Sequence, residues 1–379
     1  MKLILKLVSG IIFGIIIGLI QVEWLTRLLI TVKDIFGQFI GFMIPLIILF
    51  FIASGVSKLG GKSGKLVGFT VGTAYISTFL AGVTAYIIAT IVVPIISSEG
   101  TQPVEGTALE AFFSFQIAPL MGVITALVLA FIFGISMAKL KSNALITIFD
   151  EGKEIVDLII RKIIIPFLPI YISGIFAGLA SEGTVFDTLR VFGIVLLVAV
   201  ITHWIWLIVQ YSIAGVFTKR NPLLLIKTML PAYFTAIGTM SSAATIPVTL
   251  KQAKENKVRE EVANFSIPLF ATIHLSGSVI TIVTCAVAVM SILDGYSIPT
   301  FLEMIPVILM LGVIMIAAPG VPGGAIMAAL GVLTSMLGFT DVAIGLMIAL
   351  YMAQDSFGTA ANVTGDGAMS VIIDQTMEK

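Results

Sequence analysis

Residues 354–368 read QDSFGTAANVTGDGA and directly follow DVAIGLMIALYMA (341–353), an apolar stretch with no charge after its first residue. Drawn as a helix, these stretches place four polar side chains within about 60° of one another around the axis. The four are Asp355, Thr359, Asn362 and Asp366. Ionisable groups at membrane depth are expensive and usually mark a functional site. The stretch therefore predicts a membrane helix whose polar stripe faces a cavity able to hold a cation or an ammonium group.

An alternative places the residues from Asp355 onward in the cytosol, as the hydrated end of a helix. That would leave 341–354 too short to cross a bilayer, which takes roughly 20 apolar residues. Small residues also flank the polar stripe, and they allow other backbones to approach closely. We therefore interpret 341–370 as a transmembrane span.

The composition is that of a polytopic membrane protein. Of the 379 residues, 58% are hydrophobic and 11% are charged, whereas a soluble domain carries about 25% charged residues. The mean hydropathy is +1.13. The formal net charge of zero gives no indication of nucleic-acid binding, and the single cysteine, Cys285, excludes a disulfide framework. The apolar start of the chain is interpreted as a first span rather than a cleaved signal peptide.

Eight segments are long and apolar enough to be predicted as spans: 3–20, 28–57, 67–97, 113–138, 155–180, 189–217, 264–292 and 341–370. Two further apolar segments, 222–253 and 301–338, are interrupted in the middle by SSAAT and APGVPGG. Each arm is mostly too short for an ordinary span. Paired interrupted segments are typical of transporter sites, so both are predicted to be re-entrant hairpins. An irregular loop or one long kinked span is the alternative for each.

The distribution of charge predicts the topology. Basic residues lie in connections that would be cytoplasmic if the chain starts inside: Lys58, Lys62, Lys65, Lys139, Lys141, Lys219, Arg220 and the stretch 251–261. The alternate loops, 97–110, 181–187 and 293–297, contain acidic residues and no lysine or arginine. The positive-inside rule then puts both termini in the cytoplasm of a multi-pass plasma (cytoplasmic) membrane protein. Hairpin 222–253 would enter from the cytoplasm and hairpin 301–338 from outside, so that their tips meet near the midplane.

Two other polar breaks accompany the stripe. Ser241 and Ser242 stand at the tip of the first hairpin, where they could bind a carboxylate or simply cap a helix. The stretch PLFATIHLSGS (268–278) carries polar side chains in mid-span. Broken helices there can offer carbonyls to sodium or protons to a relay. For His274, an interhelical hydrogen bond and a proton-carrying role both stay open.

Four motifs resemble those of one transporter family: NVTGD (362–366), MSSAATIPVT (240–249), GVPGGAIM (320–327) and MIPLIILFFIASGV (43–56). With them the chain resembles the dicarboxylate/amino acid:cation symporter family, which has the glutamate transporter fold. The resemblance covers nearly the whole chain in order. It implies an all-α polytopic membrane protein with eight transmembrane helices and two re-entrant helical hairpins. It also implies a homotrimer whose transport domains move like elevators against a scaffold.

The resemblance also implies a division of the chain. Residues 1–66 would hold scaffold spans 1 and 2, and 67–112 would hold span 3 of the transport domain with an external loop. Residues 113–217 would hold scaffold spans 4 and 5 with span 6 of the transport domain. Residues 218–379 would form the core of the transport domain, with hairpin 222–253, span 264–292, hairpin 301–338 and span 341–370.

Residue roles follow from the same resemblance. Asp355 would bind the α-amino group of a substrate, and Asn362, Ser242 and the backbone at Gly324 would hold its α-carboxylate. The full substrate set is Ser241, Ser242, Ser278, Gly324, Asp355, Gly358, Thr359 and Asn362. Asp366 would bind one sodium ion with carbonyls near Phe270, His274 and Asn362. Thr272 and the backbone at Ile316 and Ala318 would bind another.

The departures from the family pattern point to an unusual member. The family has Asn-Met-Asp-Gly-Thr where this chain has HLSGS (274–278), so Ser276 replaces a ligand of a third sodium. A proton on His274 is a hypothesis for part of the coupling. Gly358 and Met240 stand where members with acidic substrates carry arginine, and Tyr351 replaces an acidic neighbour of Asp355. A side-chain carboxylate would lack a bidentate partner, so a neutral amino acid is the expected substrate.

The predicted function is therefore cation-coupled secondary active symport of neutral amino acids by an elevator mechanism. Its expected partners are a small-molecule amino acid, sodium or a proton, and the lipid bilayer, with sodium as a coupling ion and no other cofactor. An acidic amino acid or dicarboxylate symporter of the same fold is the alternative. An ion or anion channel and an intramembrane aspartyl protease are alternatives of other classes. Against the protease, Asp355 and Asp366 would lie about 16 Å apart along one helix rather than face each other.

Overall fold

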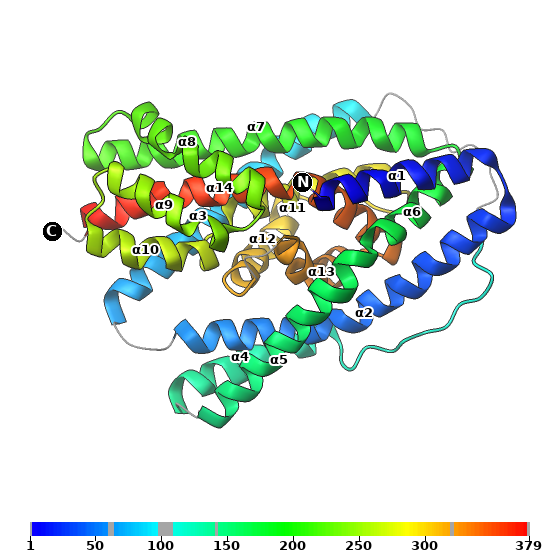
Figure 1. Cartoon of the computed structure of the whole chain (residues 1–379), viewed down its shortest axis with the longest axis horizontal. Helices are drawn as coiled ribbons and strands as arrows, with labels where there is room; N and C mark the ends of the chain where they lie inside the picture. The colour runs from blue at the N-terminus through cyan, green and yellow to red at the C-terminus, as the bar shows by residue number, and fades with distance from the viewer. Residues whose placement is uncertain (1, 60–63, 98–108, 141–142, 319–321, 377–379) are drawn as a thin grey trace.

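The computed structural model describes residues 2–59, 64–97, 109–140, 143–318 and 322–376, and these residues form helices and connections without strands. The molecule is elongated, with several helices running along its length (Figure 1). The prediction of an all-α fold is confirmed. The predicted external loop 97–110 falls mostly outside the described residues, as do Lys62, Lys141 and part of the tip of the second hairpin.

Among the described residues, eight helices are long and apolar enough to cross a membrane, judged by length and composition: Glu23–Ser57, Gly68–Pro94, Val123–Leu140, Asn143–Ser181, Val185–Thr218, Pro222–Thr239, Glu260–Ile292 and Asp341–Thr376. This set of eight helices differs from the eight predicted spans in two places. Pro222–Thr239, predicted as a hairpin arm, meets the length criterion with 18 residues. The first predicted span, 3–20, corresponds to the apolar helix Lys2–Ile20, of which the stretch Leu5–Ile20 was compared with the length criterion. Length and hydropathy alone therefore do not separate hairpin arms from spans.

One group of helices comes from the first half of the chain: α1 (Lys2–Ile20), α2 (Glu23–Leu59), α4 (Val123–Leu140), α5 (Asn143–Ile159), the π-helical turn η1 (Ile160–Ile164) and α6 (Ile165–Ser181). α1 packs along α6, and α2 packs along α4, α5 and α6. Glycines make the first of these contacts possible. A Cβ on Gly10 would lie 2.3 Å from the carbonyl oxygen of Pro169, and one on Gly14 would lie 2.2 Å from that of Ser173.

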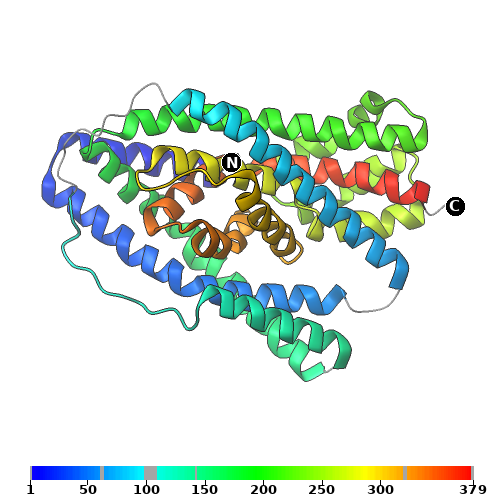
Figure 2. The same ribbon diagram turned by 180° about the vertical axis from the view of Figure 1, so that it is seen from behind.

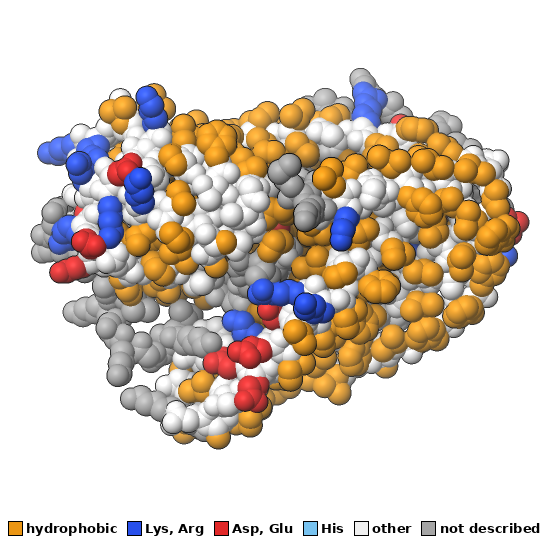
Figure 3. Space-filling view, in the orientation of Figure 1, with side chains coloured by type: hydrophobic (Ala, Val, Ile, Leu, Met, Phe, Trp, Pro, Cys, Tyr) orange, Lys and Arg blue, Asp and Glu red, His pale blue; other side chains and the backbone are white. Residues whose placement is uncertain are grey.

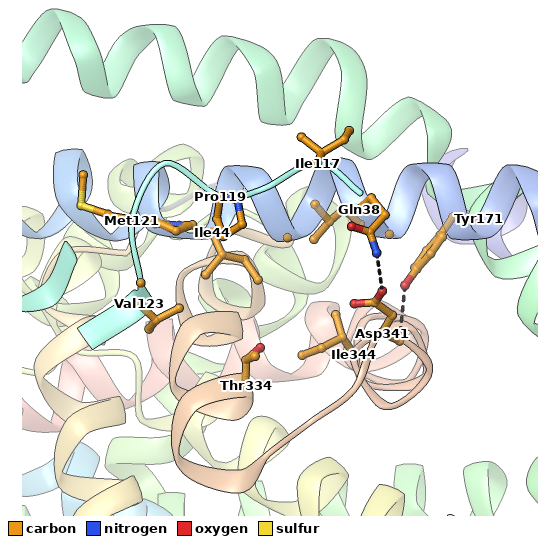
Figure 4. Close-up of a pocket in the computed structure, with 15 residues that line it drawn as sticks. Gln38, Ile44, Ile117, Pro119, Met121, Val123, Tyr171, Thr334, Asp341 and Ile344 are labelled. Atoms are coloured by element: carbon orange, nitrogen blue, oxygen red, sulfur yellow. Dashed lines mark hydrogen bonds between the residues drawn. The ribbon is translucent and has the colours of Figure 1, made fainter. Parts of the chain in front are cut away.

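The predicted start of the fourth span at residue 113 is wrong, because α4 begins only at Val123. The preceding apolar segment is not helical and runs beside α2, where Figure 4 shows Ile117 and Pro119. The Arg27 guanidinium donates to the Glu110 carbonyl at 3.0 Å, and the Phe112 amide donates to the Thr31 hydroxyl at 2.9 Å. These bonds hold the backbone of Glu110 and Phe112, just before the segment, against α2.

A second group surrounds the last helix: α3 (Gly64–Ser97), α7 (Val185–Thr218), α8 (Pro222–Thr239), α9 (Ser242–Glu255), α10 (Glu260–Ile273), α11 (Ser276–Ile292), α12 (Phe301–Met315), α13 (Gly324–Leu337) and α14 (Asp341–Thr376). α11 packs on α3 and α14, while α8, α9 and α10 pack on the later part of α14. All three predicted interruptions are breaks between helices: α8 to α9, α10 to α11, and α12 to α13.

The helix α14 is buried along nearly its whole length, in the middle of this second group (Figures 1 and 2). Asp355, Asn362 and Asp366 are 3%, 2% and 1% exposed. The alternative that residues from Asp355 onward form a hydrated helix end is therefore excluded. A helix without a solvent face can carry acids only where neighbouring groups compensate them.

Basic side chains gather at the end of the molecule that carries the C-terminus (Figure 3). This is the end where α7 ends, α8 begins, α9 ends and α10 begins (Figure 1). Hydrophobic side chains cover much of the remaining surface in the same view. At this end, Arg259 links the start of α10 to the end of α14. Its Nε donates to Asp374 Oδ1 at 2.7 Å, and its Nη2 donates to the Asp374 carbonyl at 2.8 Å.

Candidate functional site

The carboxylate of Asp355 lies against the start of α13, at the tip of the second helix pair. Its Oδ2 accepts a hydrogen bond from the Gly323 amide at 2.8 Å. Gly323 has φ of 74°, a left-handed conformation that favours glycine, and a Cβ there would lie 2.8 Å from Met352 Sδ. The turn before α13 therefore reaches the buried acid through its backbone.

Tyr351 is a second partner of Asp355, one helical turn earlier on α14. Its side chain is 1% exposed, and its hydroxyl faces the side chains of Ser278 and Asp355. The sequence singled out Tyr351 only as the replacement of an acid. Its spacing of four residues from Asp355 was the available signal, because residues at i and i+4 share a helix face.

Asn362 caps the start of α11. Its Oδ1 accepts hydrogen bonds from the amides of Gly277 at 2.7 Å and Ser278 at 3.2 Å. Its Nδ2 donates to the Ser278 hydroxyl at 2.9 Å. The N-cap residue of α11, Leu275, has no capping side chain, so an asparagine from another helix satisfies these amides. The predicted substrate residues Asn362 and Ser278 are thus brought together.

α11 and α14 approach each other closely at two glycines. A Cβ on Gly277 would lie 2.3 Å from the Gly358 carbonyl oxygen and 2.7 Å from Ala361 Cβ. A Cβ on Gly358 would lie 3.2 Å from Thr281 Oγ1. Gly358, the residue that resemblance places against a substrate side chain, is itself buried between these helices. Thr359, its neighbour on the stripe, is 5% exposed.

His203 on α7 was not among the predicted site residues. Its Nε2 lies 3.0 Å from the Gly277 carbonyl oxygen and 3.1 Å from Thr281 Oγ1, and the side chain is 1% exposed. His203 therefore holds the backbone of α11 at Gly277, where α11 contacts α14. The presence of a histidine in the middle of a mostly apolar span was the available sequence signal for it.

The structure brings His274 and Asp366 into direct contact, with His274 Nδ1 2.8 Å from Asp366 Oδ1. The other predicted ion-binding residues are arranged differently. The Phe270 carbonyl accepts a hydrogen bond from the His274 amide at 2.9 Å. Thr272 is exposed and its hydroxyl donates to the Leu269 carbonyl at 2.8 Å. Ile316 packs against the apolar cluster that contains Phe270, and Ala318 is buried nearby in sequence.

At the tip of the first helix pair, capping accounts for one of the two predicted serines. Ser241 is the N-cap of α9, and its hydroxyl accepts a hydrogen bond from the Ala244 amide at 3.3 Å. Ser242 is 4% exposed. Met240 has φ of 52°, and Thr239 and Thr245 join their hydroxyls across the tip at 3.0 Å. The turn is therefore held by its own hydroxyl groups.

A family model described as the sodium:dicarboxylate symporter family matches residues 3–376. The chain belongs to the sodium:dicarboxylate symporter family. Its members are transporters rather than enzymes, and the apolar helices agree with a multi-pass membrane protein. The predicted family resemblance is confirmed.

Among curated members of this symporter family, similarity extends to proteins with different substrates in their names. Excitatory amino acid transporter 1 of Ambystoma tigrinum is 29% identical over 64% of the chain, and that of Homo sapiens is 28% identical over 65%. The serine/threonine transporter SstT of Acinetobacter baylyi is 31% identical over 60% of the chain. The alignments span 45% of each excitatory transporter and 58% of SstT, so the chain matches about half the length of these relatives.

This symporter family member also has a cavity of about 320 Å³ away from the polar stripe. It lies between α2, the segment before α4, α6, α13 and the start of α14 (Figure 4). Gln38 Nε2 lies 3.4 Å from Asp341 Oδ2, and the Tyr171 hydroxyl donates to the Asp341 carbonyl at 3.1 Å. Asp341 precedes Asp355 by about 21 Å along α14. The cavity thus marks the junction of the two helix groups and not the Asp355 site.

Proposed function

We propose that this protein is a cation-coupled secondary active symporter of a small neutral amino acid, working in a cytoplasmic membrane. Membership of the symporter family supports the transport class. The serine/threonine transporter among the relatives supports the substrate class by analogy. The chemistry of the residues around Asp355 supports the transport class and the substrate class.

The observation that carries the proposal is the buried carboxylate of Asp355 at the tip of α13. Its described partners, the Gly323 amide and the Tyr351 hydroxyl, are neutral donors. A buried carboxylate that lacks a charged partner is costly, and a cation with hydrogen-bonding capacity offsets that cost. The α-ammonium group of an amino acid supplies both properties. The α-carboxylate would then face the helix starts of α9 and α13, whose amides favour anions.

The surroundings favour a neutral side chain on the substrate. No buried lysine or arginine occurs among the residues that the structure describes. At Gly358, the position expected to face the substrate side chain, the neighbours are Thr281 and the Gly277 backbone. A second substrate carboxylate would therefore be buried without a cationic partner. The alternative of an acidic substrate, which the excitatory transporter relatives favour, predicts instead that a second substrate carboxylate is bound.

For the coupling cation, the end of α12 is the site that we propose for sodium. Thr272 and the backbone at Ile316 and Ala318 would hold it, since backbone carbonyls at interrupted helices coordinate sodium in transporters. A third sodium site is not proposed, because Ser276 replaces its aspartate. Coupling follows if cation and substrate both stabilise the same closed hairpin, which makes their affinities reciprocal.

The packing of the two hairpins supports an elevator in which the second helix group moves against the first. α13 packs on α2 and α4, and α14 packs on α6, whereas the main partners of α8 and α9 are α7, α10 and α14. We propose that α8–α9 and α12–α13 are re-entrant and that the carrier is a homotrimer. The basic end of the molecule, which carries the C-terminus, would face the cytoplasm under the positive-inside rule.

A thermal-shift screen of the purified protein against amino acids, with sodium or choline chloride, tests the proposal. Ligands that bind the folded state raise its apparent stability, by about 2.7 kcal/mol at a concentration of 100 Kd. We expect a small neutral amino acid to raise the Tm in sodium. Stabilisation by glutamate, aspartate or a dicarboxylate alone would establish the acidic alternative. In proteoliposomes, uptake that survives loss of the cation gradients would indicate a channel.

Replacing Gly358 by arginine tests the proposed side-chain subsite. We expect Gly358→Arg to lose binding of the neutral amino acid by at least about tenfold, because a buried guanidinium without a partner is costly. A substrate carboxylate can supply that partner, so binding of aspartate or glutamate should increase. The same screen measures both changes. Unaltered preference in the folded variant would show that position 358 does not face the substrate.

A further inference from the structure

Asp366 is held by a built polar cluster that the proposed function does not use. The cluster consists of Ser77 on α3, Gln210 on α7, His274 between α10 and α11, and Asp366 on α14. These side chains are 6%, 1%, 0% and 1% exposed, respectively. Three helices and the break between α10 and α11 therefore converge on one buried position.

The cluster fixes both ring nitrogens of His274. Nδ1 lies 2.8 Å from Asp366 Oδ1, and Nε2 lies 2.9 Å from the Ser77 hydroxyl oxygen. Gln210 Nε2 donates to the same Ser77 oxygen at 2.9 Å and lies 3.4 Å from His274 Nε2. Because an ionised carboxylate only accepts hydrogen bonds, the hydrogen between His274 and Asp366 belongs to Nδ1.

Backbone features make room for this ring. His274 is the C-cap of α10 with φ −109° and ψ 90°, so it leaves the helix where α10 ends. Gly365 provides the facing surface on α14. A Cβ there would lie 3.1 Å from His274 Cε1 and 2.8 Å from Gln210 Oε1. The glycine of the NVTGD motif thus lets the imidazole and the amide pack directly against the backbone of α14.

This arrangement does not fit a sodium ion on the same carboxylate oxygen. Hard cations are held by oxygen ligands, whereas Asp366 Oδ1 faces a ring N–H. A cation bound at that oxygen would lie beside a hydrogen of partial positive charge, and repulsion between like charges is strong where water is excluded. The ring N–H already gives this buried carboxylate oxygen the hydrogen bond that it needs.

We propose that the imidazole of His274 takes the place of the sodium ion that the family resemblance assigns to Asp366, so that this chain has no sodium site there. The proposal deepens the proposed function and rests on it for the role of the cation. Coupling to sodium, where it occurs, then runs through the site at Thr272, Ile316 and Ala318.

Equilibrium binding of radioactive sodium to the full-length protein in lipid nanodiscs tests this, with no amino acid present. Four proteins are compared: wild type, Asp366→Asn, His274→Asn and the double variant. We expect Asp366→Asn to leave sodium binding of the wild type unchanged. His274→Asn restores the family residue and frees the carboxylate, so sodium affinity or stoichiometry should rise, by about tenfold in affinity. Adding Asp366→Asn should remove that gain.

Two outcomes overturn the proposal: loss of wild-type sodium binding in Asp366→Asn, or no gain of sodium binding in His274→Asn. Size-exclusion chromatography checks that each protein is folded, and His274→Gln serves as a second variant that removes the ring. If Asp366→Asn does not fold, the comparison of the wild type with the two His274 variants still decides. Because no amino acid is present, the sodium measurement can be interpreted even if the proposed substrate class is wrong.

Discussion

Asparagine in place of Asp355 is expected to abolish amino-acid binding, with a loss of affinity of about 100-fold or more, since removing one partner of a buried charge pair costs several kcal/mol. The carboxylate sits at the α13 tip with neutral partners, and an amide cannot compensate an ammonium group. Titration calorimetry with the amino acid that the thermal-shift screen identifies measures the loss.

The matched control is Asp374→Asn, the same substitution on the same helix. Asp374 pairs with Arg259 at the far end of α14, about 28 Å from Asp355. This variant should keep the affinity for the amino acid even if its stability falls. Equal affinity in the wild type and Asp355→Asn would remove the carboxylate from the substrate site and leave the proposed function without its main support.

A second large effect is expected from a single methyl group at Gly277. In Gly277→Ala the new Cβ would lie 2.3 Å from the Gly358 carbonyl oxygen. The obstacle is backbone, so no side chain can rotate away, and α11 and α14 must separate. Overpacking of this kind costs about 3 kcal/mol or more. We expect a large fall in Tm and in the yield of monodisperse protein, together with loss of the Asn362 cap on α11.

Gly72→Ala is the control for this prediction. Gly72 lies within α3, and a Cβ there meets no atom within 4 Å. Because alanine has the better helix propensity, this variant should match the wild type or gain up to about 1 kcal/mol. If Gly277→Ala were as stable as Gly72→Ala, the close approach of α11 and α14 would not exist in the folded protein.

Local chemistry explains which features the sequence could predict. Hydropathy along the chain determined the all-helical membrane class, and the breaks at SSAAT, HLSGS and APGVPGG fall between α8 and α9, α10 and α11, and α12 and α13. The polar stripe of α14 followed from helical periodicity. Each of these depends on residues close together in the chain, which is why a single sequence sufficed.

The same local rules failed where partners come from distant segments. The apolar residues 113–122 looked like part of a span, but they are not helical, and Arg27 and Thr31 on α2 bind the backbone of Glu110 and Phe112 just before them. His203 carried no motif, and only packing shows that it lies behind Gly277. Sequence spacing cannot predict such contacts, because they join residues about 80 positions apart.

The sequence by itself determined the membrane helices, their interruptions and the acids that they bury, because hydrophobicity, helical period and helix-breaking residues act over a few residues. The tertiary structure alone decided what compensates those acids. It placed the Gly323 amide on Asp355, the Asn362 amide on α11 and the His274 ring on Asp366. A buried charge must be balanced by whatever the fold brings within about 3 Å of it, and that choice is made only when distant helices pack.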